Sequence, residues 1–207
     1  AAADALVSKM SAAMQGLKVG AFCDSDNDFG PVITPQHKEK INGYIHSAET
    51  QGASIVVDGR NPEVPGYEQG FFVGGTLIDH VKPGMNCYEH EIFGPVLLVV
   101  RAESMDDAMK MIDDHEYGNG TCIFTRDGEA ARYFADKIQV GMVGINVPLP
   151  VPVSYHSFGG WKRSLFGDLH AYGPDAVRFY TKRKTITQRW PSAGVREGTV
   201  FSFPSNR

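Results

Sequence analysis

The spacing of apolar residues predicts two helices and a strand in the first sixty residues. Apolar residues recur every three or four positions between Asp4 and Leu17, which is typical of an amphipathic helix. Thr34 followed by Pro35 predicts the start of a second helix, because threonine caps a helix and proline is tolerated at the first helical position. Gly52 ends its apolar stripe, and the run "ASIVVDG" then predicts a short buried strand.

The pattern becomes regular after residue 95. The apolar runs "VLLVVR", "TCIFT" and "VGMVGIN" predict three buried strands, and amphipathic stretches from Ser104 and Asp127 predict the helices between them. Ser104 and Asp107 have the spacing of a capping box. Strands that alternate with helices imply right-handed crossovers. The sequence therefore predicts an α/β fold, with a mainly parallel sheet and flanking helices.

The alternation of strand and helix patterns ends at Pro148. Prolines at every second position in "PLPVPV" exclude a helix or a central strand there. Apolar and polar residues then alternate from Val177 to Thr187, which predicts a long C-terminal strand. Because one edge of such a strand would be unpaired, we expect it to bind another subunit in a homo-oligomer; the alternative is an ordinary edge strand of the chain's own sheet. We expect a main domain (residues 1–173), this oligomerisation strand (174–190) and a tail (191–207).

Composition and charge exclude several classes of function. The 207 residues are 42% hydrophobic and 21% charged, as in an ordinary globular protein. A formal net charge of -4 gives no support to nucleic-acid binding, and no apolar run approaches the roughly 20 residues that span a bilayer. The cysteines Cys23, Cys87 and Cys122 are widely spaced, which favours a reducing compartment over a disulfide framework. The sequence has no dinucleotide fingerprint and no cluster with metal-ligand spacing.

The segment "HEIFGPVLLVV" (residues 90–100) has two interpretations. On the pattern alone an ordinary turn is favoured, in which Ile92 and Phe93 enter the core and Glu91 stays in solvent. In the functional interpretation, Glu91 accepts hydrogen bonds from a vicinal diol such as ribose, and Phe93 forms a wall against a flat ring such as nicotinamide. Ligands of open α/β sheets usually lie at the C-terminal ends of strands, whereas this segment opens its strand. This objection to the functional interpretation weakens if a second domain brings the cofactor to the segment.

Several motifs occur together in the order found in one family. The blocks "EIFGPV", "YGNGTCIFTRD", "VGMVGINVP", "SFGGWKRSLFGD" and "FYTKRKTIT" resemble the C-terminal half of aldehyde dehydrogenases, and the likeness covers nearly the whole chain. More narrowly, "NVPLPVPVSYHSFGGWK" and "RSLFGD" are similar to the CoA-acylating methylmalonate-semialdehyde dehydrogenases. Leu165 and Phe166 stand where most relatives have Ser-Gly-x-Gly. The resemblance implies an aldehyde dehydrogenase catalytic-domain fold.

The resemblance also implies roles for individual residues. Glu91 would hold the nicotinamide ribose of NAD, Phe93 would pack beside the nicotinamide, and Phe158 would lie by the aldehyde tunnel. The segment Val177 to Thr187 would extend the sheet of a neighbouring subunit in a dimer or tetramer. The nucleophilic cysteine of the family would precede residue 1, so we expect no catalytic residue in this chain and no activity from the chain alone. We also expect no metal site, because no cluster of residues has metal-ligand spacing.

The implied reaction is the NAD-dependent oxidation of malonate or methylmalonate semialdehyde through a thioacyl-enzyme. This intermediate would lose CO2 and pass its acyl group to coenzyme A, giving acetyl-CoA or propionyl-CoA. Two alternatives stay open: a non-acylating aldehyde dehydrogenase that uses NAD or NADP with water as the final nucleophile, and a stand-alone, non-catalytic oligomerisation module. The resemblance implies a location in the cytoplasm of a bacterium or in the mitochondrial matrix of a eukaryote.

Overall fold

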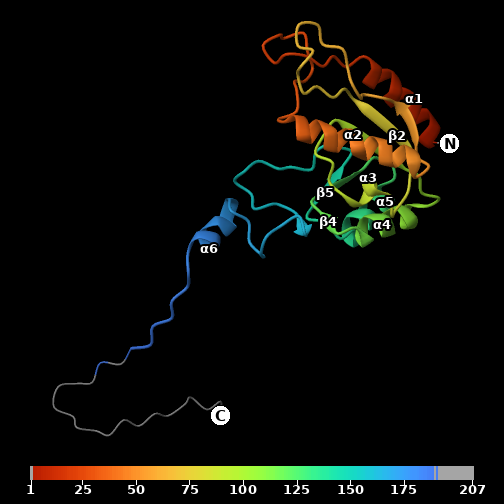
Figure 1. Cartoon of the computed structure of the whole chain (residues 1–207). Helices are drawn as coiled ribbons and strands as arrows, with labels where there is room; N and C mark the ends of the chain where they lie inside the picture. The colour runs from red at the N-terminus through yellow and green to blue at the C-terminus, as the bar shows by residue number, and fades with distance from the viewer. Residues whose placement is uncertain (1, 189, 191–207) are drawn as a thin grey trace. The chain divides into compact units, whose positions relative to one another are not determined.

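The structure is a computed structural model that describes residues 2–188 and 190 (Figure 1). The chain divides into two compact units, one of residues up to 151 together with 159–166, and the other of residues 152–158 together with those after 166. In chain order the elements are α1 (Ala2–Gln15), α2 (Pro35–Thr50), β1 (Ser54–Val57), β2 (Thr76–Val81), α3 (Asn86–Glu89), β3 (Val96–Val100), α4 (Met105–Asp114), β4 (Tyr117–Gly118), β5 (Gly120–Ile123), α5 (Gly128–Lys137), β6 (Met142–Ile145), β7 (Trp161–Lys162), η1 (Gly173–Asp175) and α6 (Ala176–Tyr180).

A three-stranded sheet with the order β1-β2-β3 lies at the centre of the N-terminal half of the first unit. Strand β1 is antiparallel to β2, and β2 is parallel to β3. Figure 1 shows α1 and α2 on opposite faces of this sheet, and both helices contact β1 and β2. Successive residues of β2 point to opposite faces and, with the exception of His80, are nevertheless buried, because each face is covered by a helix.

The larger core cluster fills the space between α2 and the sheet. Complete burial of each large aliphatic side chain stabilises the fold by about 1.5–3 kcal/mol relative to its exposure. The apolar stripe predicted for the second helix is confirmed, since its aliphatic members have no exposed surface. The buried members of this cluster are Ile41, Ile45, Ala48, Ala53, Val73, Ile78, Val81, Met85, Cys87 and Ile92.

The three predicted helix starts are confirmed, and at each of them a side chain accepts a backbone hydrogen bond. Loss of such a cap typically costs about 1 kcal/mol. The pairs are Thr34 Oγ1 with the N–H of His37 (3.1 Å), Ser104 Oγ with the N–H of Asp107 (3.1 Å), and Asp127 Oδ1 with the N–H of Glu129 (2.8 Å).

The C-terminal half of the first unit contains a second, smaller core. Strands β5 and β6 are parallel and are connected by α5, as the alternation of strands and helices predicts. Met109 from α4 packs with Phe134, Ile138 and Val140 to fill the space beside this pair. The α/β fold class is therefore confirmed. Two of the four strand pairs are parallel and two, β1 with β2 and β4 with β7, are antiparallel, so among the described sheets the three-stranded one is mixed.

The predicted strand from Val177 to Thr187 is wrong for the chain by itself. Ala176–Tyr180 form the helix α6, and residues 181–188 form no strand. A strand needs a neighbour for its N–H and C=O groups, and no strand among the described residues pairs with this segment, whereas a helix satisfies these groups internally. The same finding contradicts the alternative of an ordinary edge strand. The expected tail (191–207) lies outside the described residues, and the expected boundary at residue 173 stays a prediction.

Candidate functional site

A pocket of about 640 Å³ lies between two walls of the first unit. The segment from residue 90 to 94, which joins α3 to β3, forms one wall. The strand pair β4–β7, with the residues that follow each strand, forms the other. The lining residues with polar groups in their side chains include His90, Glu91, His115, Asn119, Arg163 and Ser164, together with the tyrosines Tyr88 and Tyr117.

Phe93 has the most unusual conformation in the first wall. Its φ angle is +57°, in the left-handed region that a bulky side chain rarely adopts, and its side chain is 74% exposed. The expectation that Phe93 enters the core is therefore wrong. Residues held in this region cost about 1–3 kcal/mol and cluster at functional sites, which makes the exposed ring of Phe93 a candidate contact for a ligand.

The neighbours of Phe93 explain how this conformation is held. Ile92 is 7% exposed and anchors the segment in the main core, as expected. On the other side, a Cβ added to Gly94 would lie 2.6 Å from Cδ1 of Ile41, so the backbone passes close against α2. With its ends fixed in this way, the segment turns both Glu91 and Phe93 outward, and both line the pocket.

Arg163 carries the cation of the opposite wall. It forms an ion pair with Glu116, which raises the pKa of the guanidinium above its ordinary value. Its guanidinium carbon lies 5.9 Å from the centre of the Tyr117 ring, within the range of a cation–π contact. Sequence reasoning missed this residue, although a basic side chain directly after "GGWK" was the available signal.

The cysteines of the chain are poor candidates for a nucleophile. Cys87 lines the pocket but is 1% exposed, and burial raises the pKa of its thiol, so the reactive thiolate is disfavoured. Cys23 is exposed outside the pocket, and Cys122 is partly buried in β5. Within residues 2–188 and 190, no three His, Cys, Asp or Glu side chains come together as metal ligands, and no helix is long and apolar enough to cross a bilayer.

Phe158 belongs to the second unit, whereas Glu91 and Phe93 belong to the first. Its ring lies 4.7 Å from the ring of Tyr172, measured between centroids. The preceding residue, Ser157, donates a hydrogen bond to the carbonyl of Tyr172 (3.1 Å) and accepts one from the N–H of Asp175 (3.0 Å). Phe158 is therefore held by contacts within its own unit.

The first-unit pocket offers a carboxylate, an exposed aromatic ring and a guanidinium. An ionised carboxylate only accepts hydrogen bonds, which suits the hydroxyls of a sugar, and the flat face of Phe93 suits a planar heterocycle. These groups fit the nicotinamide riboside part of NAD. Among the described residues, this pocket holds groups that suit such a ligand, and its one cysteine, Cys87, is buried with a raised thiol pKa.

Comparison with known proteins places the chain among enzymes of one family. The model of the aldehyde dehydrogenase family matches residues 1–186. Malonate-semialdehyde dehydrogenase of Pseudomonas aeruginosa is 63% identical over 203 residues, which are 98% of this chain and 41% of that protein. The acylating, mitochondrial methylmalonate-semialdehyde/malonate-semialdehyde dehydrogenase of Mus musculus is 50% identical over 191 residues, 92% of this chain and 35% of that protein.

Solved structures agree with these relatives. The crystal structure of methylmalonate-semialdehyde dehydrogenase from Oceanimonas doudoroffii matches with a TM-score of 0.87 and 80% identity, over 95% of this chain and 40% of that one. A Sinorhizobium meliloti protein that is named as the same enzyme and is complexed with NAD matches with a TM-score of 0.87 and 52% identity, over 93% of this chain and 39% of that one. The chain spans about two-fifths of the length of these relatives, and it belongs to the aldehyde dehydrogenase family.

Proposed function

We propose that this chain is the C-terminal part of an NAD-dependent, CoA-acylating dehydrogenase for malonate and methylmalonate semialdehydes. Relatives with these names match it at 50–63% identity, and solved structures with the corresponding names match it at 52–80%. The chain spans 41% of the Pseudomonas protein, so the activity belongs to the longer protein. The 207 residues alone are expected to be inactive, because none of their cysteines has the setting of a nucleophile.

The outward presentation of Glu91 and Phe93 at one pocket is the observation that carries this proposal. Glu91 would accept hydrogen bonds from the nicotinamide ribose, and Phe93 would pack beside the nicotinamide ring. NAD, when bound, supplies the hydride acceptor for oxidation of the aldehyde. The two residues would fix the position of the ring, because a near-attack geometry is worth several powers of ten in rate.

Coenzyme A is the acyl acceptor that the comparisons favour over water. The mouse relative is named as acylating and is 50% identical, whereas structures of betaine aldehyde dehydrogenase match at 29–30% identity. With coenzyme A as acceptor, a thioacyl group on the enzyme would lose CO2 and leave as acetyl-CoA or propionyl-CoA. A non-acylating dehydrogenase that releases its product to water is the second candidate.

The same proposal assigns a role to Phe158, a partner to the C-terminal segment and a location to the protein. Phe158 would line the aldehyde path, since it is an aromatic side chain fixed by its neighbours. Residues 181–187 would become a strand when a second subunit supplies an edge to pair with, giving a homo-oligomer. The relatives include a bacterial protein and proteins named as mitochondrial, so the cytoplasm or the mitochondrial matrix would be the location.

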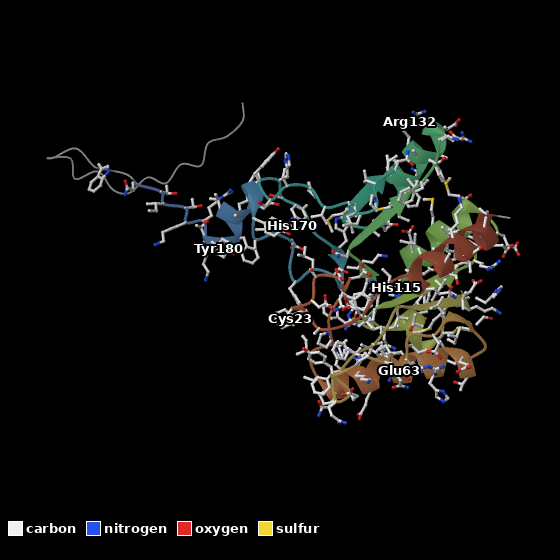
Figure 2. The ribbon with its side chains drawn as sticks, turned by 90° about the horizontal axis from the view of Figure 1, so that it is seen from above. Cys23, Glu63, His115, Arg132, His170 and Tyr180 are labelled. Atoms are coloured by element: carbon white, nitrogen blue, oxygen red, sulfur yellow. The ribbon has the colours of Figure 1, made fainter. Side chains whose placement is uncertain are left out.

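Replacement of Glu91 by Gln in the full-length enzyme tests the proposed role of the pocket. Gln keeps the size of the side chain but loses the charge that strengthens hydrogen bonds to hydroxyls by about 1.5–3 kcal/mol, so we expect a loss of roughly tenfold or more in kcat/KM for NAD. Glu63→Gln makes the same chemical change at an exposed residue outside the pocket (labelled in Figure 2) and serves as the control.

NADH formation from malonate semialdehyde, with and without coenzyme A, completes the test. Turnover that requires coenzyme A and yields acetyl-CoA supports the acylating reaction. Full turnover without coenzyme A supports the second candidate. Unchanged NAD kinetics in Glu91→Gln, together with a lower melting temperature, would indicate that Glu91 only stabilises the fold.

A further inference from the structure

The C-terminal end of helix α4, residues 111–115, makes hydrogen bonds to both walls of the pocket. It contributes carbonyl groups and the side chain of His115, which is labelled in Figure 2. The pocket-lining residues of the two walls, Glu91 and Phe93 on one side and Arg163 and Ser164 on the other, come from segments about 70 residues apart. Their spacing therefore depends on what joins the segments.

His115 connects the end of α4 to the first wall. The N–H of Tyr117 donates to Nδ1 of His115 (3.2 Å), so Nδ1 must accept, and the proton on Nε2 can then be donated to the carbonyl of Tyr88 (3.0 Å). The Tyr88 hydroxyl in turn donates to the carbonyl of Met111 (3.1 Å). Tyr88 lies three residues before Glu91, so these bonds fix the start of the segment that carries Glu91 and Phe93.

Lys162 connects the same helix end to the second wall. Its ammonium group donates to the carbonyls of Ile112 (3.0 Å), Asp113 (2.8 Å) and His115 (3.1 Å), which uses all three of its donors. The last turn of α4 has no basic residue of its own, although the C-terminal end of a helix carries partial negative charge. Lys162 supplies that cation from strand β7.

Backbone conformation shows that the second wall is held under strain. Lys162 has a φ angle of +52°, so both walls contain a non-glycine residue in the left-handed region, Phe93 in one and Lys162 in the other. Directly after Lys162 come Arg163 and Ser164, and Ser164 Oγ accepts a hydrogen bond from the N–H of Gly118 (3.1 Å). The anchored ammonium thus determines where these two pocket residues lie.

From these contacts we infer that His115 and Lys162 are positioning residues for the nicotinamide site. They act through the end of α4, which sets the separation of the Glu91–Phe93 wall and the Arg163–Ser164 wall. This inference rests on the proposed function of the pocket. Lys162 is not among the residues that line the pocket and acts through the α4 carbonyls. His115 lines the pocket, but both of its ring nitrogens are engaged, by the N–H of Tyr117 and the carbonyl of Tyr88, so it acts through the Tyr88 carbonyl.

Lys162→Met and His115→Phe in the full-length enzyme test the inference. Met keeps the length of lysine without its donors, and Phe keeps the aromatic contacts with Tyr88 and Tyr117 without the ring nitrogens. We expect each variant to raise the Kd for NAD roughly tenfold and also to lower kcat, because displaced walls weaken binding and misplace the nicotinamide ring. Lys162→Arg, which keeps the cation and several donors, should recover most of the affinity.

Lys110→Met is the matched control, because it removes an exposed ammonium group from the same helix without touching either wall. The double variant Lys162→Met/His115→Phe should raise the Kd for NAD less than the product of the two single effects, because both residues act on the same helix end. Kd is measured by titration of the folded protein, and thermal unfolding is followed separately.

Three outcomes are distinguishable. A raised Kd in both variants, with the Lys110→Met protein unchanged, supports the inference. If both variants bind NAD like Lys110→Met and only their melting temperatures fall, the contacts are structural and the inference is wrong. If Glu91→Gln also binds NAD normally, the proposed function of the pocket has failed as well.

Discussion

Arg101 holds the carboxylate of Asp79 with two hydrogen bonds, from Nε to Oδ1 at 3.0 Å and from a terminal guanidinium nitrogen to Oδ2 at 2.6 Å. Asp79 is 4% exposed in strand β2, and the same guanidinium reaches Asp4 of α1 at 2.7 Å. One arginine thus ties together the sheet and the helix that covers it. The hydrogen bond from Arg101 holds the pKa of Asp79 below its ordinary value of 3.8.

Asp79→Asn should destabilise the full-length protein by about 2 kcal/mol, because it removes a buried charge-assisted pair while Arg101 stays in place. Since the pKa of Asp79 is lowered in the folded state, its contribution is complete above pH 3.8 and is lost as the pH falls through the lowered value. The free energy of unfolding should be measured for both proteins between pH 3 and pH 7. The difference between wild type and Asp79→Asn should become smaller at the acid end of this range. Asp114→Asn, at the exposed pair with Lys110, is the control and should change little. A difference in the free energy of unfolding that stays constant over this pH range would mean that the charge of Asp79 does not stabilise the fold.

Phe93→Gly should weaken NAD binding at almost no cost in stability. Glycine adopts the φ angle of +57° without strain, and this relief of about 1–2 kcal/mol offsets the entropy that glycine adds to the unfolded chain. Phe124→Gly is a matched control, because Phe124 is also exposed but lies outside the pocket and is not among the residues with positive φ. Thermal unfolding and NAD titration of both proteins check this. A larger loss of stability for Phe93→Gly than for Phe124→Gly would mean that the ring of Phe93 is buried against other residues in the full-length protein.

The cysteines should differ in their reaction with an alkylating reagent. Cys23 is exposed, whereas Cys87 is buried with a raised thiol pKa, so iodoacetamide at neutral pH should modify Cys23 first. Peptide mass spectrometry of the native chain over time measures the order. Equal rates at Cys23 and Cys87 would mean that the segment around α3 opens readily, and the low reactivity assigned to Cys87 would then be wrong.

Thr181→Pro combined with Thr185→Pro should lower the mass of the native oligomer. Proline removes a donor from any strand ladder that residues 181–187 form with a partner, while a distant core stays folded. Thr185→Val keeps the N–H and the branched side chain, so it should leave the mass unchanged. Light scattering of the full-length variants decides, and a double-proline protein of unchanged mass would exclude this segment as the interface.

Features that depend on neighbouring residues were predictable from the sequence. The caps at Thr34, Ser104 and Asp127 use side chains that bond within three residues, so the local pattern contains all the necessary information. The parallel pairing of β5 and β6 follows from the helix between them. Glu91 and Phe93 were expected as site residues from the family resemblance, since the pattern alone favoured a turn and placed Phe93 in the core.

Features that depend on distant contacts were not predictable. The outward turn of Phe93 requires the close approach of Gly94 to Ile41, more than 50 positions earlier in the chain. The three carbonyl partners of Lys162 come from a helix end about 50 residues away, and no pattern near "GGWK" predicts them. The alternation from Val177 to Thr187 predicts a strand, but a strand forms only where a partner edge exists, so the chain alone has a short helix there.

Each of the two units contains segments that are not consecutive in the sequence, which restricts where the chain can be cut or recombined. Residues 152–158 belong to the second unit, yet 159–166 return to the first before the chain leaves again. Ser157 of the earlier stretch is bonded to Tyr172 and Asp175 of the later one, and a Cβ on Gly173 would lie 2.3 Å from the nitrogen of Ser157. A single cut therefore cannot separate the units. In a chimera between family members, residues 152–158 and the residues after 166 must therefore come from the same parent. Otherwise the second unit would combine two segments whose contacts did not evolve together.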